Sequence, residues 1–226
     1  MKLNTNSNVY TIVYASVMVI IVAFLLAFVS SALKATQDAN VANDTRGQIL
    51  AALNLRDVDN VASKYKETIL QELVLNTKGE VIQQEGGFDV DSKDITAKND
   101  ADKKLPLYVA KVGNDTLYVV PLFGRGLWGG IYGYIALKND LTTVYGSNYG
   151  HESETAGLGA RIVEVEFQKS FINKIAFKDS TFSEVALGMK KKVENPNSEV
   201  DAITGSTLTS NGMDAMFKDC LSQYKN

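Results

Sequence analysis

The sequence predicts an α+β domain that follows a single N-terminal membrane helix. Three observations carry this prediction. An apolar run near the N-terminus is long enough to cross a bilayer, and alternating apolar residues between positions 105 and 149 indicate two β-hairpins. Apolar residues also recur at helical spacing before and after the hairpins. Because the strands are grouped and the helices flank them, we expect a twisted antiparallel sheet with helices packed on it.

The N-terminal segment has the composition of a membrane anchor. No charged residue lies between Lys2 and Lys34, and residues 9–33 are mostly apolar. About twenty apolar residues span a bilayer core as a helix. A cleaved signal peptide ending near Ser30-Ser31-Ala32 is the alternative, but the run is longer than a signal core and a single lysine precedes it. We therefore expect a short cytoplasmic leader at 1–10 and a transmembrane helix at 11–33.

Two further segments complete the expected organisation. Residues 34–78 are expected to form a helical connector, with helices at 45–55 and 58–75, and residues 79–226 an extracytoplasmic domain. Basic residues are nearly balanced across the span, so the orientation rests on the shortness of the leader. After a turn at 76–79, a strand begins at Val81, and the polar stretch 86–104 is expected to be a surface loop.

The sheet is predicted from two strand pairs. Residues 107–112 and 116–120 flank a Gly113-Asn114-Asp115 turn, and residues 131–138 and 142–149 flank Asn139-Asp140-Leu141. Residues 172–177 and 183–192 add further strand-like runs. Downstream, Met213, Met216, Phe217, Cys220 and Leu221 follow the i, i+3, i+4, i+7, i+8 spacing of one buried helical face.

Composition excludes several function classes. The net charge of −3 argues against nucleic-acid binding, which usually shows a basic face. The single cysteine, Cys220, forms no intrachain disulfide, and without a Cys-x-x-Cys pair no iron–sulfur or structural zinc site is indicated. His151 is the only histidine, so a histidine-rich metal site is impossible. We expect no bound metal and no catalytic residue.

Three segments could bind a ligand. The first, Asp201-Ala-Ile-Thr-Gly-Ser-Thr207, places three hydroxyls and a glycine before a helix, where free N–H groups and the helix dipole favour an anion. Ordinary helix capping explains the same residues. The second, Gly124 to Gly130, contains four glycines and Trp128, suited to a flat ligand or to a tight turn. The third, residues 151–159, opens a possible helix and offers Glu154 and Thr155 as hydrogen-bonding groups, or as a helix cap.

Together and in this order, the three segments resemble the C subunit of the sodium-translocating NADH:quinone oxidoreductase family. Asp201, Thr204, Gly205 and Thr207 match its flavin acceptor pattern, with Ser206 at a usual alanine. The Gly-x-Gly-Leu-Trp loop is matched by Gly124, Gly126, Leu127 and Trp128. The His…Glu-Thr-Pro-Gly-Leu-Gly segment is matched by His151, Glu154, Thr155, Gly157, Leu158 and Gly159, with Ala156 at the proline and one extra residue after the histidine.

The resemblance implies a covalent FMN. A flavin transferase would join FMN through its phosphate to Thr207, and the chain would relay electrons between an iron–sulfur centre and the flavin of the neighbouring B subunit. It further implies a single-pass protein of the bacterial inner membrane, with its soluble domain in the periplasm and other subunits of the complex as partners. The implied flavin-contacting residues are Thr207, Asp201, Thr204, Gly205, Ser206, Leu208, Thr209, Gly126, Leu127, Trp128, Glu154, Thr155, Gly157 and Leu158.

Two other interpretations stay open at this point. The G subunit of the Rnf-type ferredoxin:NAD oxidoreductase shares the anchor, the domain and the covalent FMN. The helical stretch after the span and the Gly-Leu-Trp loop favour the sodium-pump family over it. The third interpretation is a membrane-anchored binding domain without redox function, in which all three segments are ordinary turns and caps.

Overall fold

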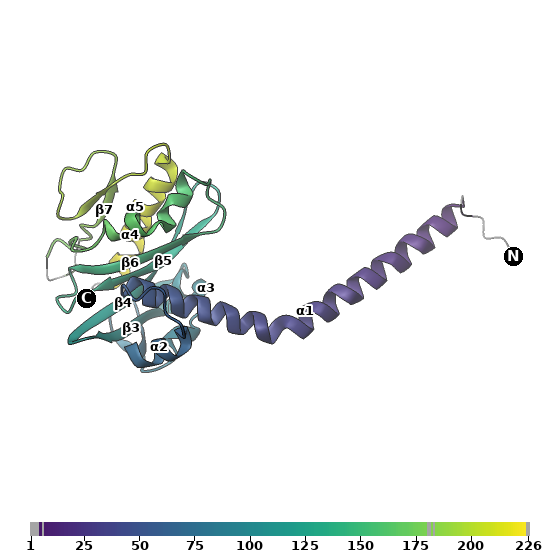
Figure 1. Cartoon of the computed structure of the whole chain (residues 1–226), viewed down its shortest axis with the longest axis horizontal. Helices are drawn as coiled ribbons and strands as arrows, with labels where there is room; N and C mark the ends of the chain where they lie inside the picture. The colour runs from purple at the N-terminus through teal and green to yellow at the C-terminus, as the bar shows by residue number, and fades with distance from the viewer. Residues whose placement is uncertain (1–4, 6, 180–181, 183, 225–226) are drawn as a thin grey trace. The chain divides into compact units, whose positions relative to one another are not determined.

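The computed structural model describes residues 5, 7–179, 182 and 184–224, and the chain divides into two compact units, residues 1–44 and 45–226 (Figure 1). Helix α1 (Asn8–Ala52) is continuous from the first unit into the second. An 18-residue window of α1 has a mean hydropathy of 2.9 and is fully exposed, so α1 is long and apolar enough to cross a membrane. Residues 1–4 and 6 of the expected leader lie outside the described residues.

A six-stranded antiparallel sheet forms the centre of the second unit, in the order β2-β1-β3-β4-β5-β6. The first two strands are β1 (Ile69–Leu75) and β2 (Val81–Gln83). The expected hairpins follow as β3 (Leu105–Val112) with β4 (Asp115–Arg125), and β5 (Gly130–Leu137) with β6 (Val144–His151). Gly113 has a φ of 61° in the β3–β4 turn, a conformation that favours glycine. The predicted fold class and both hairpins are confirmed.

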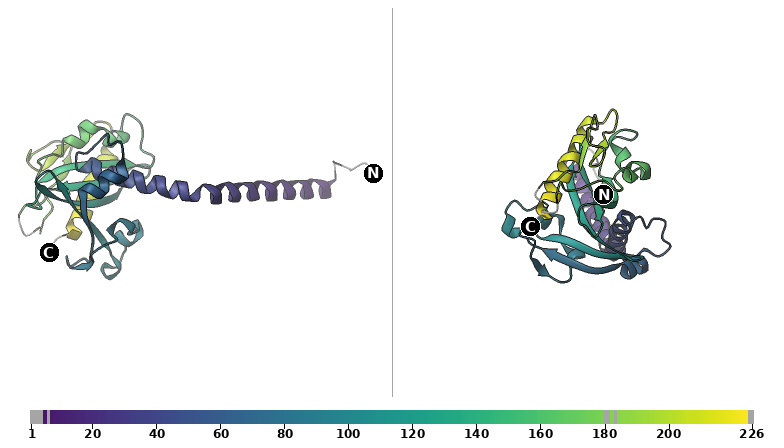
Figure 2. Two further views of the ribbon diagram at one scale, coloured as in Figure 1. Left: turned by 60° about the horizontal axis from the view of Figure 1, so that its bottom comes forward. Right: turned by 90° about the vertical axis from the view of Figure 1, so that its left-hand side faces the viewer.

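Helices cover both faces of the sheet because side chains alternate along each strand. On one face, Leu117 and Val119 of β4 pack with Tyr65 of α2 (Val61–Thr68) and with Ile49 and Leu50 at the end of α1. On the other face, Val120 and Leu122 pack against α5 (Thr207–Leu221). Figure 2 shows α5, in yellow, running along this second face.

Helix α5 confirms the predicted apolar face. Met213, Met216, Phe217, Cys220 and Leu221 are all buried, and they share one core with β4, β5 and β6. Phe217 lies 5.3 Å from Phe171 and 5.8 Å from Tyr149, measured between ring centroids. These aromatic contacts pack α5 against the rest of the core. Beside α5, a two-stranded parallel sheet joins β7 (Gly188–Lys190) to β8 (Glu199–Asp201), which ends where the hydroxyl-rich segment begins.

Short elements fill the remaining connections. Between β2 and β3 lie η1 (Gly87–Asp89), α3 (Ser92–Ile95) and η2 (Asp100–Asp102), in the stretch expected to be a surface loop. After β6 come η3 (Gly159–Val163) and α4 (Val165–Lys169), and η4 (Ser222–Tyr224) follows α5.

Several local predictions are wrong. The helix expected over 58–75 ends at Thr68, and residues 69–75 form β1, because Ile69 and Leu73 fit a strand as well as a helix. The strand-like run 172–177 forms only isolated bridges at Ile175 and Phe177. Within 183–192, the described residues contribute the short β7 and a bridge at Val185, while Ser183 lies outside them. By contrast, a helix does begin within 151–159, as expected: it starts at Gly159 and is a 3₁₀ helix.

Candidate functional site

The centre of the candidate site is the buried carboxylate of Glu154, which joins the second and third segments singled out from the sequence to Thr209, two residues after the first segment. Its Oε1 accepts a hydrogen bond from the backbone N–H of Trp128 at 2.9 Å. Its Oε2 accepts one from the Thr209 hydroxyl of α5 at 2.6 Å, across 55 residues of sequence. The backbone N–H of Glu154 in turn donates to Nδ1 of His151 at 3.2 Å. We call these four residues the Glu154 cluster.

Electrostatics favour the ionised form of Glu154. Burial alone would raise the pKa of its carboxyl, but hydrogen bonds from the Thr209 hydroxyl and from the backbone N–H groups of Trp128 and Leu127 outweigh burial. The pKa is therefore lowered below its usual range. Hydrogen bonds to a charged carboxylate are stronger than hydrogen bonds between neutral groups, so the charge strengthens the contacts of Glu154 with Trp128 and Thr209.

Glycines allow the backbone to close around this carboxylate. A Cβ on Gly126 would lie 2.4 Å from Glu154 Oε1, and a Cβ on Gly159 would lie 2.3 Å from Glu154 Oε2 and 2.5 Å from the Thr209 hydroxyl oxygen. Gly126 also closes its own loop, since its N–H donates to the carbonyl of Gly129 at 2.9 Å. At both positions only a glycine leaves room for the carboxylate.

The same loop packs tightly against α5. A Cβ on Gly212, in the middle of the helix, would lie 2.2 Å from the Arg125 carbonyl oxygen, and one on Gly124 would lie 2.7 Å from the Met216 Cβ. Sequence reasoning missed Gly212, although a glycine inside a helix costs stability and so signals a close backbone approach.

The hydroxyl-rich segment turns tightly into α5. Gly205 has a φ of 80°, and a Cβ there would lie 3.0 Å from Cδ2 of Leu158 in the third segment. Ser210, which the sequence did not single out, fixes the turn: its hydroxyl donates to the Ser206 carbonyl at 2.8 Å and accepts from the Ile203 N–H at 3.1 Å. The signal available in the sequence was only its place four residues after Ser206.

Thr207 is the first residue of α5 and is exposed. Ser206 stands at the N-cap but its side chain makes no capping hydrogen bond, so it leaves the N–H groups of the first turn to other acceptors. The positive end of the helix dipole adds to them, which makes the position suited to a phosphate.

Large apolar side chains stand exposed around this helix start. Leu208 is 58% exposed, Trp128 65%, Leu127 47% and Leu158 41%. Two of them lie at fixed points of the fold: the backbone N–H of Trp128 donates to Glu154, and Leu158 approaches Gly205 closely. Exposed apolar side chains on a rigid base are typical of a surface that receives a ligand or a partner.

The structure brings part of the predicted set together, with Gly159 of the third segment. Glu154, Thr209, Trp128, Gly126 and Gly159 contact one another. Thr155 is exposed and instead accepts, through its carbonyl, from the N–H groups of Leu158 and Ala160. Asp201 and Thr204 are also exposed, and Gly157 turns the chain with a φ of 76°. The contacts of all the predicted residues with a ligand stay predictions.

The residues around Thr207 fit an FMN. The hydroxyl and the free end of α5 suit its phosphate, the glycines leave room for close backbone approach, and the exposed apolar side chains suit the flat face of its ring. Among the described residues, no group of three or more histidine, cysteine, aspartate or glutamate side chains could hold a metal ion.

Comparison with known proteins gives concordant results. The FMN-binding domain family matches residues 126–222. The C subunit of the Na(+)-translocating NADH-quinone reductase of Haemophilus ducreyi is 32% identical over 96% of this chain and 91% of that protein. The corresponding protein of Neisseria meningitidis serogroup A is 27% identical over 96% of this chain and 90% of its own length.

Solved structures agree with these sequence matches. The crystal structure of the Na(+)-translocating NADH-quinone reductase C subunit from Parabacteroides distasonis is 33% identical, has a TM-score of 0.77, and covers 85% of this chain and 94% of that one. The chain, with its FMN-binding domain, therefore belongs to the C-subunit family of the Na(+)-translocating NADH-quinone reductase.

Proposed function

We propose that Thr207 carries FMN through a phosphoester bond and that the chain is an electron-carrying subunit of a sodium-translocating NADH:quinone oxidoreductase. The observation that carries the proposal is the exposed Thr207 hydroxyl at the free N-terminal end of α5, next to the Glu154 cluster. Because the curated relatives we compared are all named as the C subunit of that reductase, family membership favours this function over the Rnf-type subunit and over a domain without redox function.

The attachment chemistry follows from the position of the hydroxyl. A flavin transferase would supply FAD, the Thr207 oxygen would bond to the FMN phosphorus, and the pyrophosphate bond would break with release of AMP. The hydroxyl proton would pass to solvent. Thr207 is thus an attachment point, and the first-turn N–H groups of α5 stabilise the phosphate charge before and after transfer.

Once bound, FMN supplies the electron-carrying chemistry, and the protein supplies position and surroundings. Trp128, Leu158 and Leu208 would exclude water from the faces of the ring. Glu154 fixes the position of the loop around Trp128 relative to α5, because it accepts a hydrogen bond from each. We further propose that residues 79–226 face the periplasm, that the electron partners are an iron–sulfur centre of the membrane subunits and the flavin of the B subunit, and that the chain has no activity alone.

Substitution of Thr207 tests the attachment. In a host that contains the transferase, Thr207→Val should abolish in-gel flavin fluorescence of the denatured chain, because valine has no hydroxyl to esterify. Thr36→Val is the matched control: it makes the same change at an exposed threonine of α1, outside all three segments, and should leave the fluorescence within about twofold, the scatter expected of a surface substitution. A Thr207→Val chain that keeps its covalent flavin would overturn the assignment.

A further inference from the structure

The Glu154 carboxylate differs from other charged groups of the chain in its burial. Among the residues that the structure describes, Glu154 is the only acidic or basic residue that is buried, with 7% of its surface exposed. Burial would raise its pKa, but the hydrogen bonds that it accepts outweigh burial and lower the pKa, so the group is ionised at neutral pH. The candidate site therefore contains a buried negative charge.

This charge is stabilised by neutral groups. Within the described part of the chain, no lysine or arginine forms an ion pair with Glu154. Its donors, the backbone N–H of Trp128 and the hydroxyl of Thr209, carry no net charge. The ring nitrogen of His151 that faces the Glu154 backbone accepts a hydrogen bond, so that nitrogen holds no proton. Neutral donors stabilise a carboxylate but leave its net charge in place.

The charge lies close to three exposed apolar side chains around the start of α5. Trp128 donates its own N–H to the carboxylate. Leu158 and Leu208 each precede a residue that contacts it. A Cβ on Gly159 would lie 2.3 Å from the carboxylate oxygen Oε2, and the Thr209 hydroxyl donates to the same oxygen at 2.6 Å. A flat ring resting on these three side chains would therefore lie about one side-chain length from the charge.

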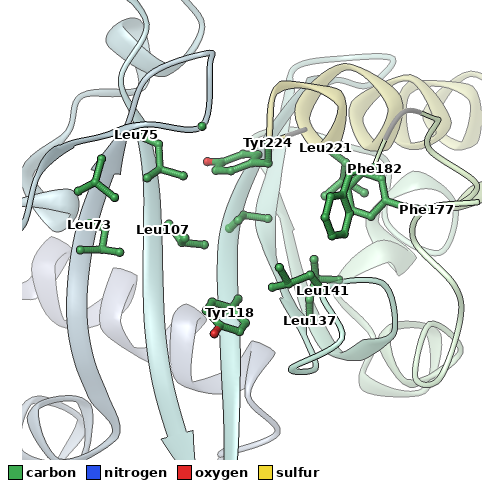
Figure 3. A pocket seen from close by; sticks show the side chains of 13 residues that line it. Leu73, Leu75, Leu107, Tyr118, Leu137, Leu141, Phe177, Phe182, Leu221 and Tyr224 are labelled. Carbon is green, nitrogen blue, oxygen red and sulfur yellow. The ribbon is translucent and has the colours of Figure 1, made fainter. Parts of the chain in front are cut away.

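The other end of α5 offers a contrast. There a cavity of about 250 Å³ lies beside Leu221 and Tyr224, and Leu73 and Leu107 stand along its other side (Figure 3). Among the described residues that line this cavity, no side chain is charged. The fifteen residues of α5 span about 20 Å at 1.5 Å per residue, so the two ends are separate. The buried charge thus belongs to the Thr207 end of the helix.

Reduction of the FMN proposed above would add charge near this carboxylate. Two electrons and one proton convert the oxidised flavin ring to the reduced ring, which carries one negative charge at neutral pH. The electrons come from the proposed iron–sulfur partner, or from dithionite in a titration, and the proton comes from solvent. Like charges repel, and a unit charge within about 12 Å shifts such an equilibrium about tenfold at an effective dielectric constant of about 20.

We propose that the charge of Glu154 lowers the reduction potential of the flavin. The inference rests on the proposed function, because it requires FMN at the start of α5. Glu154 takes no part in the chemistry and acts on the ring through its electric field, in addition to fixing the loop around Trp128 relative to α5. A lower potential makes the reduced flavin a stronger electron donor, as a carrier that passes electrons onward requires.

Redox titration of the full chain tests the proposal. Wild type and variants are purified in detergent from membranes of a host with the transferase, reduced stepwise with dithionite in the presence of mediator dyes, and followed by flavin absorbance. Glu154→Gln keeps the shape and removes the charge, so it should favour the reduced flavin about tenfold, a rise of about 30 mV for a two-electron couple. Circular dichroism checks the fold, and Glu154→Met is a second uncharged variant should Glu154→Gln unfold.

Two further variants separate charge from geometry. Glu154→Asp keeps the charge on a shorter side chain, so its potential should stay near that of wild type even where attachment falls. Glu152→Gln is the matched control, because it removes an exposed carboxylate of the same segment, whose Oε2 accepts from the Gly130 N–H at 2.8 Å. Water and salt screen an exposed charge, so this control should shift the equilibrium less than about twofold.

Two results of the titration would overturn the proposal while leaving the attachment intact. Equal potentials of wild type and Glu154→Gln would show that the charge does not act on the ring. Equal shifts in Glu154→Gln and Glu154→Asp would show that the position of the side chain matters and its charge does not.

A wild-type chain without covalent flavin would contradict the attachment and leave the proposal open to a second measurement. Free FMN is then added to the chain, and the dissociation constants of oxidised and reduced FMN are compared. Glu154→Gln should strengthen the binding of reduced FMN relative to oxidised FMN about tenfold, because the two constants are linked to the potential. An unchanged ratio, or no binding of added FMN, would overturn the proposal whether or not Thr207 is the attachment point.

Discussion

The two ends of α5 are stabilised in different ways. At its N-terminal end, the helix is fixed by polar contacts of defined geometry: the Glu154 cluster, the Ser210 hydroxyl and glycines that admit no Cβ. At its C-terminal end, Leu221 and Tyr224 pack among apolar side chains beside a cavity. The first end suits a group that must be held at one position, whereas the second tolerates variation in what fills it.

This difference predicts a separation of effects. Substitutions at the C-terminal end should cost more stability and spare flavin attachment. Substitutions at the N-terminal end should cost less stability and reduce attachment, because attachment depends on the local geometry around Thr207. We expect the loss of stability to decrease in the order Leu221→Ala, Gly159→Ala, Glu154→Ala and acidification.

The largest loss is expected for Leu221→Ala. Leu221 is fully buried, and truncating a buried leucine to alanine costs about 2–5 kcal/mol. Urea unfolding followed by circular dichroism should show this loss, while the molecules that remain folded should carry the wild-type proportion of covalent flavin. A matching fall in flavin content per folded molecule would break the proposed separation.

Gly159→Ala should cost about 1–3 kcal/mol, the usual range for overpacking. The added Cβ would meet Glu154 Oε2 and the Thr209 hydroxyl oxygen at 2.3 and 2.5 Å, so the Glu154 cluster must open. Flavin attachment, measured as fluorescence per folded molecule, should fall with it.

Gly47→Ala is the matched control for this substitution. Gly47 is helical and its added Cβ would meet nothing closer than 3.9 Å, so alanine should stabilise the chain by about 0.5–1 kcal/mol and leave attachment unchanged. Normal attachment in Gly159→Ala would mean that the cluster does not position Thr207.

Glu154→Ala should cost about 1–2 kcal/mol, because it leaves the Trp128 N–H and the Thr209 hydroxyl without their acceptor. The Trp128 loop should loosen, which raises acrylamide quenching of the single tryptophan. Glu154→Gln keeps a carbonyl acceptor of the same shape and should recover part of both the stability and the attachment. Identical behaviour of the alanine and glutamine variants would argue against a positioning role for the carboxylate.

The smallest effect is expected on acidification. The pKa of Glu154 is lowered in the folded chain, so the ionised carboxylate stabilises the fold. This contribution is present above the usual glutamate pKa of about 4.3 and is lost as the pH falls through the lower, folded value. The stability difference between wild type and Glu154→Gln should therefore shrink below about pH 4. A difference that stays constant on further acidification would contradict the charged state assigned to Glu154.

The sequence predicted those parts of the fold that depend on local patterns. Helix α5 followed from the spacing of Met213 to Leu221, and the hairpins from turns such as Gly113-Asn114 flanked by alternating strands. The switch from α2 to β1 at Ile69 was missed because one apolar pattern fits both structures over so few residues. The bridges at Ile175 and Phe177 depend on distant partners, which propensity does not encode.

The candidate site, too, could be predicted only in the parts that depend on local sequence. The three segments were recognisable from residue types and order, but the bond between Glu154 and Thr209 joins positions 55 residues apart and depends on how the sheet folds. The cavity beside Leu221 had no signal in the sequence, since leucines that line a cavity follow the same pattern as leucines that fill a core.

Peptide mass mapping of the purified chain is the most direct test of Thr207 as the FMN attachment point. Trypsin releases residues 193–218 as one peptide that carries Thr204, Ser206, Thr207, Thr209 and Ser210. When the chain is purified from membranes of a host with the transferase, we predict that this peptide is heavier by one FMN less one water and that fragmentation places the added mass on Thr207. An unmodified peptide, or the same mass on a neighbouring hydroxyl, would contradict the account.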